Sequence, residues 1–235
     1  MARSRVIHST RLIWLSLLVG IGLQSLAQVE TLIQIGPVIL EEIKQRFGTR
    51  AHNRVEQWEQ LMATNKDKSI MAKLKLVNNF FNRIRYKTDQ EHWGAEDYWA
   101  TPIELLSTNG GDCEDYSIAK YFTLRALGIA DEDLRLTYVN ALELGQAHMV
   151  LTYYGENKLN PLVLDNLTPW IQLASKRTDL APVYSFNGSG LWKSRERGRG
   201  DLLGTAENLD QWANLLTRLP PEYLSFPDID LVTNN

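Results

Sequence analysis

Apolar side chains recur at helical spacing through the first half of the chain. Between positions 70 and 84 they follow one another at steps of four, three, four and three, which predicts an amphipathic helix within 67–85. A shorter pattern of the same kind predicts a helix around 55–62. Each helix would bury its apolar face against the rest of the molecule.

Two further helices have recognisable start signals. The run Thr-Pro-Ile-Glu at 101–104 is a capping box with proline at the first helical position, and predicts a short helix through Leu106. A glycine pair at 110–111 then interrupts the chain. Asp112 is a favourable N-cap for a longer helix, and Gly128 is placed to end it.

The second half of the chain alternates apolar and polar positions as strands do. The alternation predicts strands at 134–139, 147–154 and 161–166, and a weaker strand at 182–186. A last amphipathic helix covers 209–219, where a proline pair stops it. Helices followed by strands predict an α+β fold, with N-terminal helices packed on an antiparallel β-sheet.

The first residues have the composition of an export signal. Three arginines come before an apolar stretch at 12–23, and a small-x-small cleavage pattern follows at 25–27. The apolar stretch is shorter than the roughly 20 residues that a membrane-spanning helix needs. We therefore predict a signal peptide over 1–27 and one exported domain over 28–235, with an uncleaved anchor as the alternative.

Composition and charge exclude several classes of function. The chain has 235 residues, of which 44% are hydrophobic and 23% charged, as in ordinary globular proteins. A net charge of −3 argues against a nucleic-acid partner, because phosphate binding needs a basic face. The single cysteine, Cys113, rules out an intrachain disulfide, and the histidines lack the spacing of zinc ligands.

Three residues form a candidate catalytic set. Cys113 falls in the first turn of a predicted helix, where free N–H groups and the helix dipole are expected to lower the pKa of a thiol. His148 and Asp165 fall on consecutive predicted strands, as opposite or diagonal neighbours of an antiparallel pair. A thiol, an imidazole base and a carboxylate that fixes the imidazole tautomer are sufficient for nucleophilic catalysis.

Each member of this set also has a structural interpretation. Cys113 on its own could be a small buried apolar residue, and His148 a hydrogen-bonded strand residue. Asp165 could end a strand as a turn residue. The polar surroundings of Cys113 and the order of the three residues favour catalysis, with the N–H of Cys113 as an oxyanion donor.

Four segments carry a resemblance to a known family. The run GGDCEDYSIAKY at 110–121 resembles the active-site segment of the bacterial transglutaminase-like cysteine proteinases. The segments 98–104, 147–151 and 163–167 are similar to that family's lead-in segment and to its histidine and aspartate strands. The resemblance spans roughly residues 90–190 and implies a papain-like, transglutaminase-like fold.

The resemblance also implies roles for individual residues. Cys113 corresponds to the nucleophile, His148 to the general base and acid, and Asp165 to the residue that orients the histidine. Calcium dependence is implied as well, with Asp112 and Glu114 as ligands and the neighbouring Asp115 as a weaker candidate. Carboxylates suit this hard cation, but Ca²⁺ takes six to eight oxygens, so further ligands are needed. The alternative is that these acids only cap the helix and complement its dipole.

The family resemblance implies a biological setting. The implied substrate is the N-terminal region of a large cell-surface adhesin, cut beside a pair of alanines, and cleavage would release the adhesin and disperse biofilm. The implied location is the periplasm. The implied inhibitor is the periplasmic domain of an inner-membrane cyclic di-GMP receptor.

Two other classes of function stay open at this point. A transglutaminase or a cell-wall amidase on the same fold would use the same Cys-His-Asp triad, because an amine can replace water in resolving the acyl-enzyme. A binding module that kept the fold and lost the chemistry is the other class, and the complete triad argues against it.

Overall fold

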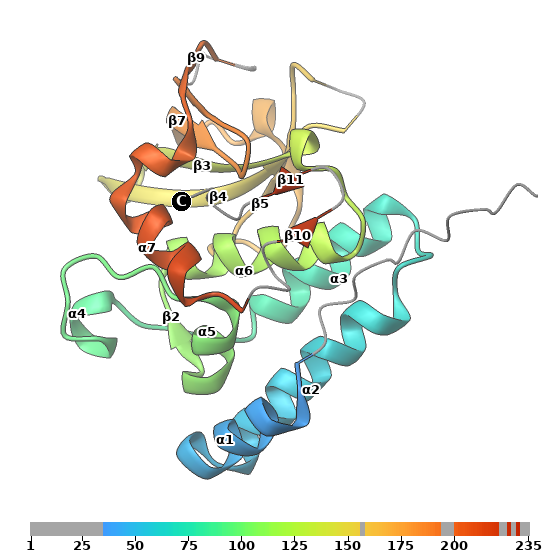
Figure 1. The fold of residues 1–235 in the computed structure, drawn as a ribbon. Helices are drawn as coiled ribbons and strands as arrows, with labels where there is room; N and C mark the ends of the chain where they lie inside the picture. Colours follow the sequence, from blue (N-terminus) through green and yellow to red (C-terminus); the bar gives the residue numbers. More distant parts are fainter. Residues whose placement is uncertain (1–34, 156–157, 194–199, 221–224, 227–228, 231–235) are drawn as a thin grey trace, which may run out of the picture. The chain divides into compact units, whose positions relative to one another are not determined.

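The helices and strands of this chain form two packed layers, a group of helices and one antiparallel sheet (Figure 1). The predicted signal peptide over 1–27 lies outside the described part of the chain and stays a prediction. Among the described helices, none has the length and hydropathy of a membrane span. The computed structural model describes residues 35–155, 158–193, 200–220, 225–226 and 229–230.

The N-terminal half is helical, as its apolar spacing predicts. Helices α1 (Pro37–Phe47) and α2 (Thr49–Thr64) are joined at Gly48, whose φ of 85° favours glycine. Helix α3 (Ile70–Phe81) confirms the predicted helix but ends before Ile84, because the chain continues into strand β1 (Arg85–Tyr86). The sequence pattern did not indicate α1.

Helix α6 (Cys113–Ala126) runs between the sheet and the other helices, and nearly all of its residues are buried. It follows α4 (Asp89–His92), α5 (Pro102–Thr108) and the two-residue strand β2 (Gly110–Gly111). Both predicted starts are confirmed, because α5 begins with the capping box at 101–104 and α6 has Asp112 as its N-cap residue.

The sheet has seven strands in the order β6-β5-β4-β3-β7-β8-β9, and every neighbouring pair is antiparallel. The four predicted strands are all present, as β3, β4, β5 and β7. The other three have only two or three residues each, too few for an alternating pattern. The strands are β3 (Leu134–Ala141), β4 (Gln146–Tyr153), β5 (Leu162–Leu164), β6 (Gln172–Leu173), β7 (Leu180–Phe186), β8 (Leu191–Lys193) and β9 (Leu202–Gly204).

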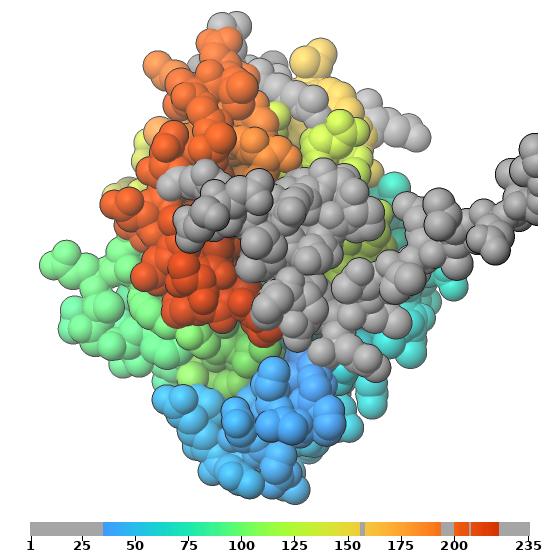
Figure 2. Space-filling view, viewed as in Figure 1, coloured from blue at the N-terminus to red at the C-terminus, as the bar shows by residue number. Residues whose placement is uncertain are grey.

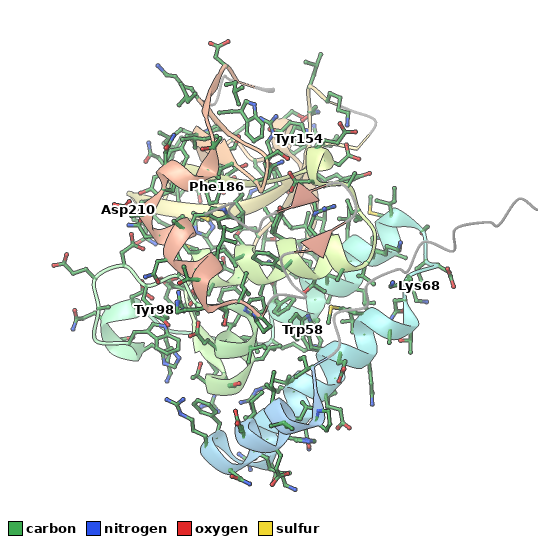
Figure 3. All side chains as sticks on the ribbon, in the orientation of Figure 1. Trp58, Lys68, Tyr98, Tyr154, Phe186 and Asp210 are labelled. Carbon is green, nitrogen blue, oxygen red and sulfur yellow. The ribbon has the colours of Figure 1, made fainter. Side chains whose placement is uncertain are left out.

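Aromatic side chains join the two layers in the core. Trp58 of α2 is fully buried and donates a hydrogen bond from Nε1 to Thr123 Oγ1 of α6 at 2.7 Å (Figure 3). Phe186 of β7 packs edge-on against Trp212, whose ring stacks on Phe122. These contacts fix α6 relative to both the first helices and the sheet.

The last helix, α7 (Asp210–Arg218), confirms the predicted C-terminal helix and packs against the loop before α5. Arg218 donates hydrogen bonds to the Tyr98 hydroxyl, the Glu104 carboxylate and the Trp99 carbonyl oxygen. Figure 2 shows the orange-red residues of this helix lying over the green residues of that region. The remaining short elements are η1 (Asp131–Asp133), η2 (Ala174–Lys176), η3 (Ala206–Asn208), β10 (Ser225–Phe226) and β11 (Ile229–Asp230).

Gly111 gives a prediction about the segment that leads into α6. A Cβ at this position would lie 2.7 Å from Leu105 Cδ1 and 3.0 Å from the Asp115 Cβ, both in the packed interior. We expect Gly111→Ala to lower the free energy of unfolding by about 1–3 kcal/mol in urea denaturation, because overpacking forces neighbours apart. Gly36→Ala is the matched control, since a Cβ there would meet no heavy atom within 4 Å and its φ of −58° suits alanine. An equal loss in both variants would contradict this account.

Candidate active site

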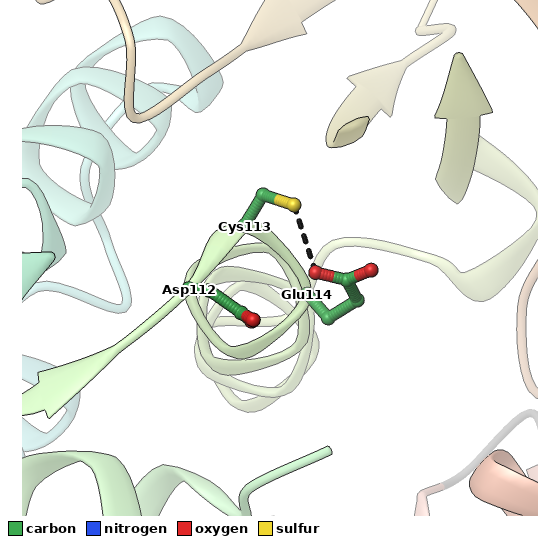
Figure 4. A group of neighbouring side chains, drawn as sticks. All are labelled: Asp112, Cys113 and Glu114. Carbon is green, nitrogen blue, oxygen red and sulfur yellow. Dashed lines mark hydrogen bonds between the residues drawn. The ribbon is translucent and has the colours of Figure 1, made fainter. Parts of the chain in front are cut away.

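Cys113 lies where the N-terminus of α6 meets strand β4. Its thiol donates a hydrogen bond to Glu114 Oε2 at 2.8 Å (Figure 4), and the backbone N–H of Met149 hydrogen-bonds to the sulfur. One turn further along α6, Ser117 donates to the carbonyl oxygen of Met149 at 3.1 Å. The candidate nucleophile is therefore held against the strand residue that follows His148.

The pKa of the Cys113 thiol shifts in the direction opposite to the sequence prediction. Burial raises the pKa of its thiol, and the carboxylates of Glu114 and Asp112 raise it further, whereas the N–H of Met149 acts in the opposite direction. The prediction that the helix N-terminus lowers this pKa is therefore wrong for this arrangement of groups. Burial and two adjacent anions outweigh the helix dipole.

His148 and Asp165 form a buried pair on neighbouring strands. Residues 151 and 164 face each other in the β4–β5 register, so position 165, just beyond β5, is a diagonal neighbour of position 148. His148 Nε2 lies 2.8 Å from Asp165 Oδ1, which confirms the predicted contact. Both residues are at most 2% exposed.

The surroundings of Asp165 favour its ionised form. Burial alone would raise the pKa of this carboxyl, but the hydrogen bonds from His148 and the N–H of Leu167, together with the ion pair with Arg177, outweigh it and lower the pKa to about 2. An ionised carboxylate only accepts hydrogen bonds, so Nε2 of His148 carries the proton in this contact. The other ring nitrogen, Nδ1, is then the atom available as a base.

Four carboxylates gather on the other side of Cys113. Asp112, the thiol and Glu114 place ligand atoms within 4.8 Å of one another, and Asp89, Asp112 and Asp115 form a second such group. Burial, followed by repulsion from Glu114, Asp115 and Asp89, raises the pKa of Asp112 to about 10. Such a concentration of acids is costly unless a cation or protons neutralise it.

The oxygens of this cluster are of two kinds. Asp115 accepts backbone N–H groups on both oxygens, from Ala100 at 2.6 Å and from Asp112 at 3.2 Å, and so fixes the start of α6. Asp112 Oδ1 and Asp89 Oδ1, by contrast, are buried without a hydrogen-bond partner in the described part of the chain. Two orphaned carboxylate oxygens beside Glu114 fit a hard divalent cation.

A cavity of about 420 Å³ opens beside the cluster. Aromatic side chains form part of its wall, and Tyr138 stacks on Tyr184 with ring centroids 5.0 Å apart. Trp99 lines it as well. The lining residues are Asp89, Glu96, Asp97, Trp99, Asp112, Glu114, Tyr138, Tyr184, Leu209 and Gln211.

Comparisons with known proteins agree with this geometry. Residues 45–186, more than half of the chain, match the family described as bacterial transglutaminase-like cysteine proteinase. The chain belongs to this family. No curated protein sequence matches it. Family membership confirms the resemblance seen in the active-site segment and the expected α+β, transglutaminase-like architecture.

Solved structures of one proteinase of this kind, Legionella pneumophila LapG, are similar to this chain over most of its length. The EGTA-treated form is 42% identical, covering 76% of this chain and 96% of that chain with a TM-score of 0.66. The calcium-bound form is 40% identical, covering 79% and 100% with a TM-score of 0.67. One of these LapG structures is thus calcium-bound, and this chain has an acidic cluster that could hold a metal.

Sequence reasoning missed two residues of this site. Asp89 joins the acidic cluster from α4, a helix of four residues that has no apolar pattern. Arg177 lies 2.8 Å from Asp165 Oδ2, although the two residues are on different elements. The family resemblance implied a cation site at the acids around Cys113, but only the fold brings Asp89 to this cluster and Arg177 to Asp165.

The lowered pKa of Asp165 predicts a specific acid sensitivity. The unfolded carboxyl takes up its proton near pH 4, and the folded one near pH 2, so the unfolded state holds more protons between these values. Ionised Asp165 therefore stabilises the fold above pH 4, by about 2–3 kcal/mol, and this contribution is lost as the pH falls to 2.

Urea denaturation from pH 6 to 2 measures this contribution. We expect Asp165→Asn to unfold with a flatter dependence on pH than the parent protein over pH 4 to 2. Asp67→Asn, at an exposed position in the loop before α3, is the control and should keep the parent slope. Equal slopes for the parent and Asp165→Asn would refute the assignment.

Proposed function

We propose that this chain is a calcium-dependent cysteine endopeptidase of the periplasm. Its substrate is the N-terminal region of a large cell-surface adhesin, cut beside a pair of alanines, and the cut releases the adhesin and promotes biofilm dispersal. Two observations carry the proposal: the contact of Cys113 with the N–H of Met149, the residue after His148 on β4, and the hydrogen bond between His148 and Asp165. Family membership and the similarity to LapG support the proteinase class.

The proposed reaction begins with transfer of the Cys113 thiol proton to Nδ1 of His148. Asp165 keeps the proton on Nε2 and so directs Nδ1 toward this task. The sulfur attacks the carbonyl carbon of the scissile peptide, and the carbonyl oxygen becomes an oxyanion. The first N–H groups of a helix have no acceptor within the helix, so the N–H of Cys113 is suited to stabilise that oxyanion.

Collapse of this intermediate breaks the carbon–nitrogen bond. The imidazolium of His148 gives its proton to the leaving amine, which departs, and a thioester remains on Cys113. Water then loses a proton to Nδ1 and attacks the thioester, which releases the new carboxyl terminus and restores the thiol. Ionised Asp165 stabilises the imidazolium at both stages.

Calcium fits the donor set on the other side of the nucleophile. Asp112 and Glu114 would hold the ion, with Asp89 as a further carboxylate. When bound, Ca²⁺ would neutralise the carboxylates that otherwise keep the Cys113 thiol protonated. The calcium-bound form of LapG supports this choice of metal.

The proposal includes a location and a regulator. Export through the leader over 1–27 would place the enzyme in the periplasm, and the adhesin would be held in the outer membrane. The periplasmic domain of an inner-membrane cyclic di-GMP receptor would inhibit the enzyme by sequestering it. Both parts rest on the family resemblance of the sequence.

Cleavage of a purified adhesin N-terminal fragment that contains an alanine pair tests the activity. The mature chain with Ca²⁺ should make one cut, and a chelator should prevent it. Cys113→Ala should reduce the rate by at least about 10⁴-fold, because the nucleophile is lost. Cys113→Ala should keep its fold, measured by thermal unfolding.

One result would replace the endopeptidase with the alternative enzyme. An intact fragment that gains a labelled amine at a glutamine side chain would show acyl transfer to an amine rather than to water. The protein would then be a transglutaminase on the same fold. The same reaction mixture, analysed by mass spectrometry, distinguishes the two products.

Calcium titration tests the metal site separately. In the Cys113→Ala background, Asp112→Asn and Glu114→Gln should each weaken Ca²⁺ binding by about tenfold or more, measured by calorimetry. In chelator, Asp112→Asn should raise the melting temperature, because it removes a buried carboxylate that its neighbours repel.

The control for the metal site comes from the same cavity. Glu96 is exposed and lines the cavity without belonging to either close acidic group. Glu96→Gln should leave Ca²⁺ affinity near that of the parent protein. Equal weakening by Glu96→Gln would show a diffuse acidic surface rather than a defined site.

A further inference from the structure

Arg177 contacts the Asp165 carboxylate at the oxygen that does not face His148. It follows η2 and is 7% exposed. Its Nη2 is 2.8 Å from Asp165 Oδ2 and 2.7 Å from Asp179 Oδ2, and its Nε donates to Asp179 Oδ1 at 2.9 Å. A single guanidinium therefore bridges the candidate catalytic carboxylate and a second aspartate.

The two oxygens of Asp165 have different partners. Oδ1 accepts from His148 Nε2 and, at 3.0 Å, from the N–H of Leu167. Oδ2 faces the guanidinium of Arg177. Rotation of the carboxylate away from the imidazole would break contacts on both oxygens, so the arginine restricts the orientation of the group that His148 needs.

The far side of Arg177 is anchored to the sheet. Asp179 holds the guanidinium through two hydrogen bonds, in the fork geometry that matches arginine to a carboxylate. The carbonyl oxygen of Asp179 accepts from the N–H of Leu142, at the end of β3, at 2.8 Å. The position of Arg177 is thus set by the hairpin that connects β3 to β4.

Lys120 is the other cation that acts on Asp165. It lies on α6 with its side chain fully buried, and Nζ has no hydrogen-bond partner within the described ranges. Burial lowers the pKa of its amine to about 7, although attraction to Asp165 opposes this. An amine with that pKa is only partly charged at neutral pH, whereas a guanidinium is always charged.

We propose that Arg177 is a positioning residue for the His148 and Asp165 pair, which it serves by holding Asp165 as an oriented anion through the bridge to Asp179. The inference rests on the proposed catalytic role of that pair. It gives Arg177 and Asp179 a function in the reaction that neither their sequence context nor family membership assigns. Neither residue touches the substrate in this account.

Carbon and nitrogen NMR of the mature Cys113→Ala protein tests the proposal without any substrate. In Arg177→Met the pKa of the Asp165 carboxyl should rise by about one to three pH units, because a buried carboxylate loses its adjacent permanent cation. The share of His148 with its proton on Nε2 should fall. Arg177→Lys should bring the Asp165 pKa part of the way back to the parent value, since lysine restores a positive charge but not the paired N–H donors of the guanidinium.

Two further variants separate positioning from general stability. Asp179→Asn keeps the arginine but weakens its anchor, and should change the His148 tautomer less than Arg177→Met does. Arg125→Met removes another buried arginine, paired with Asp131 at 3.8 Å, and should lower the melting temperature without moving either NMR signal. Unchanged Asp165 and His148 signals in folded Arg177→Met would overturn the proposal.

Kinetics on the adhesin fragment provide an independent readout. Arg177→Met should lower kcat by roughly 10- to 100-fold, the range for loss of an outer-shell partner, with KM unchanged. A rise in KM at constant kcat would overturn the positioning role. If the parent protein cleaves nothing while the NMR signals shift as expected, the positioning role stands and the proposed protease activity fails.

Discussion

The site depends on the contact between the first turn of α6 and strand β4. The N–H of Met149 hydrogen-bonds to the Cys113 sulfur and its carbonyl oxygen accepts from Ser117, so one residue of the strand contacts two successive turns of the helix. Burial of α6 along its length keeps this contact rigid, and the Trp58 to Thr123 hydrogen bond ties its far end to α2. The helix thereby brings Cys113 to the strand that carries His148.

Two groups of acidic side chains lie near the start of this helix, and they differ in how their charge is balanced. On one side, Asp165 is an anion balanced by Arg177 and His148. On the other, the carboxylates around Asp112 have no matching cation among the described residues, and the pKa of Asp112 is raised to about 10. Asp165 is therefore neutralised by side chains of the protein itself, whereas the carboxylates around Asp112 leave room for an ion. This asymmetry separates the proposed calcium site from the proposed catalytic pair.

Much of the fold follows from local pattern in the sequence. Apolar spacing is sufficient for α3 and α7, the capping box for α5, and alternation for β3, β4, β5 and β7, because each signal arises within one element or its flanking residues. The strand register implied by the turn places position 165 diagonal to 148, and hence the hydrogen bond between them. Short strands carry no periodicity, and contacts such as Arg177 to Asp165 depend on how separate elements pack. The predicted lowering of the Cys113 pKa was wrong for the same reason, since burial depends on tertiary packing.

The last helix determines when the wall of the cavity beside Cys113 is complete. Leu209 and Gln211 form part of the cavity wall, and Gln211 donates to Asp97 at 2.7 Å, across more than a hundred residues of sequence. Arg218 closes the same region through Tyr98 and Glu104. Contacts of such long sequence separation form late in folding, because loop closure precedes them. A chain that is still being synthesised thus presents Cys113 before the cavity wall is complete, because the residues of the final helix are added last.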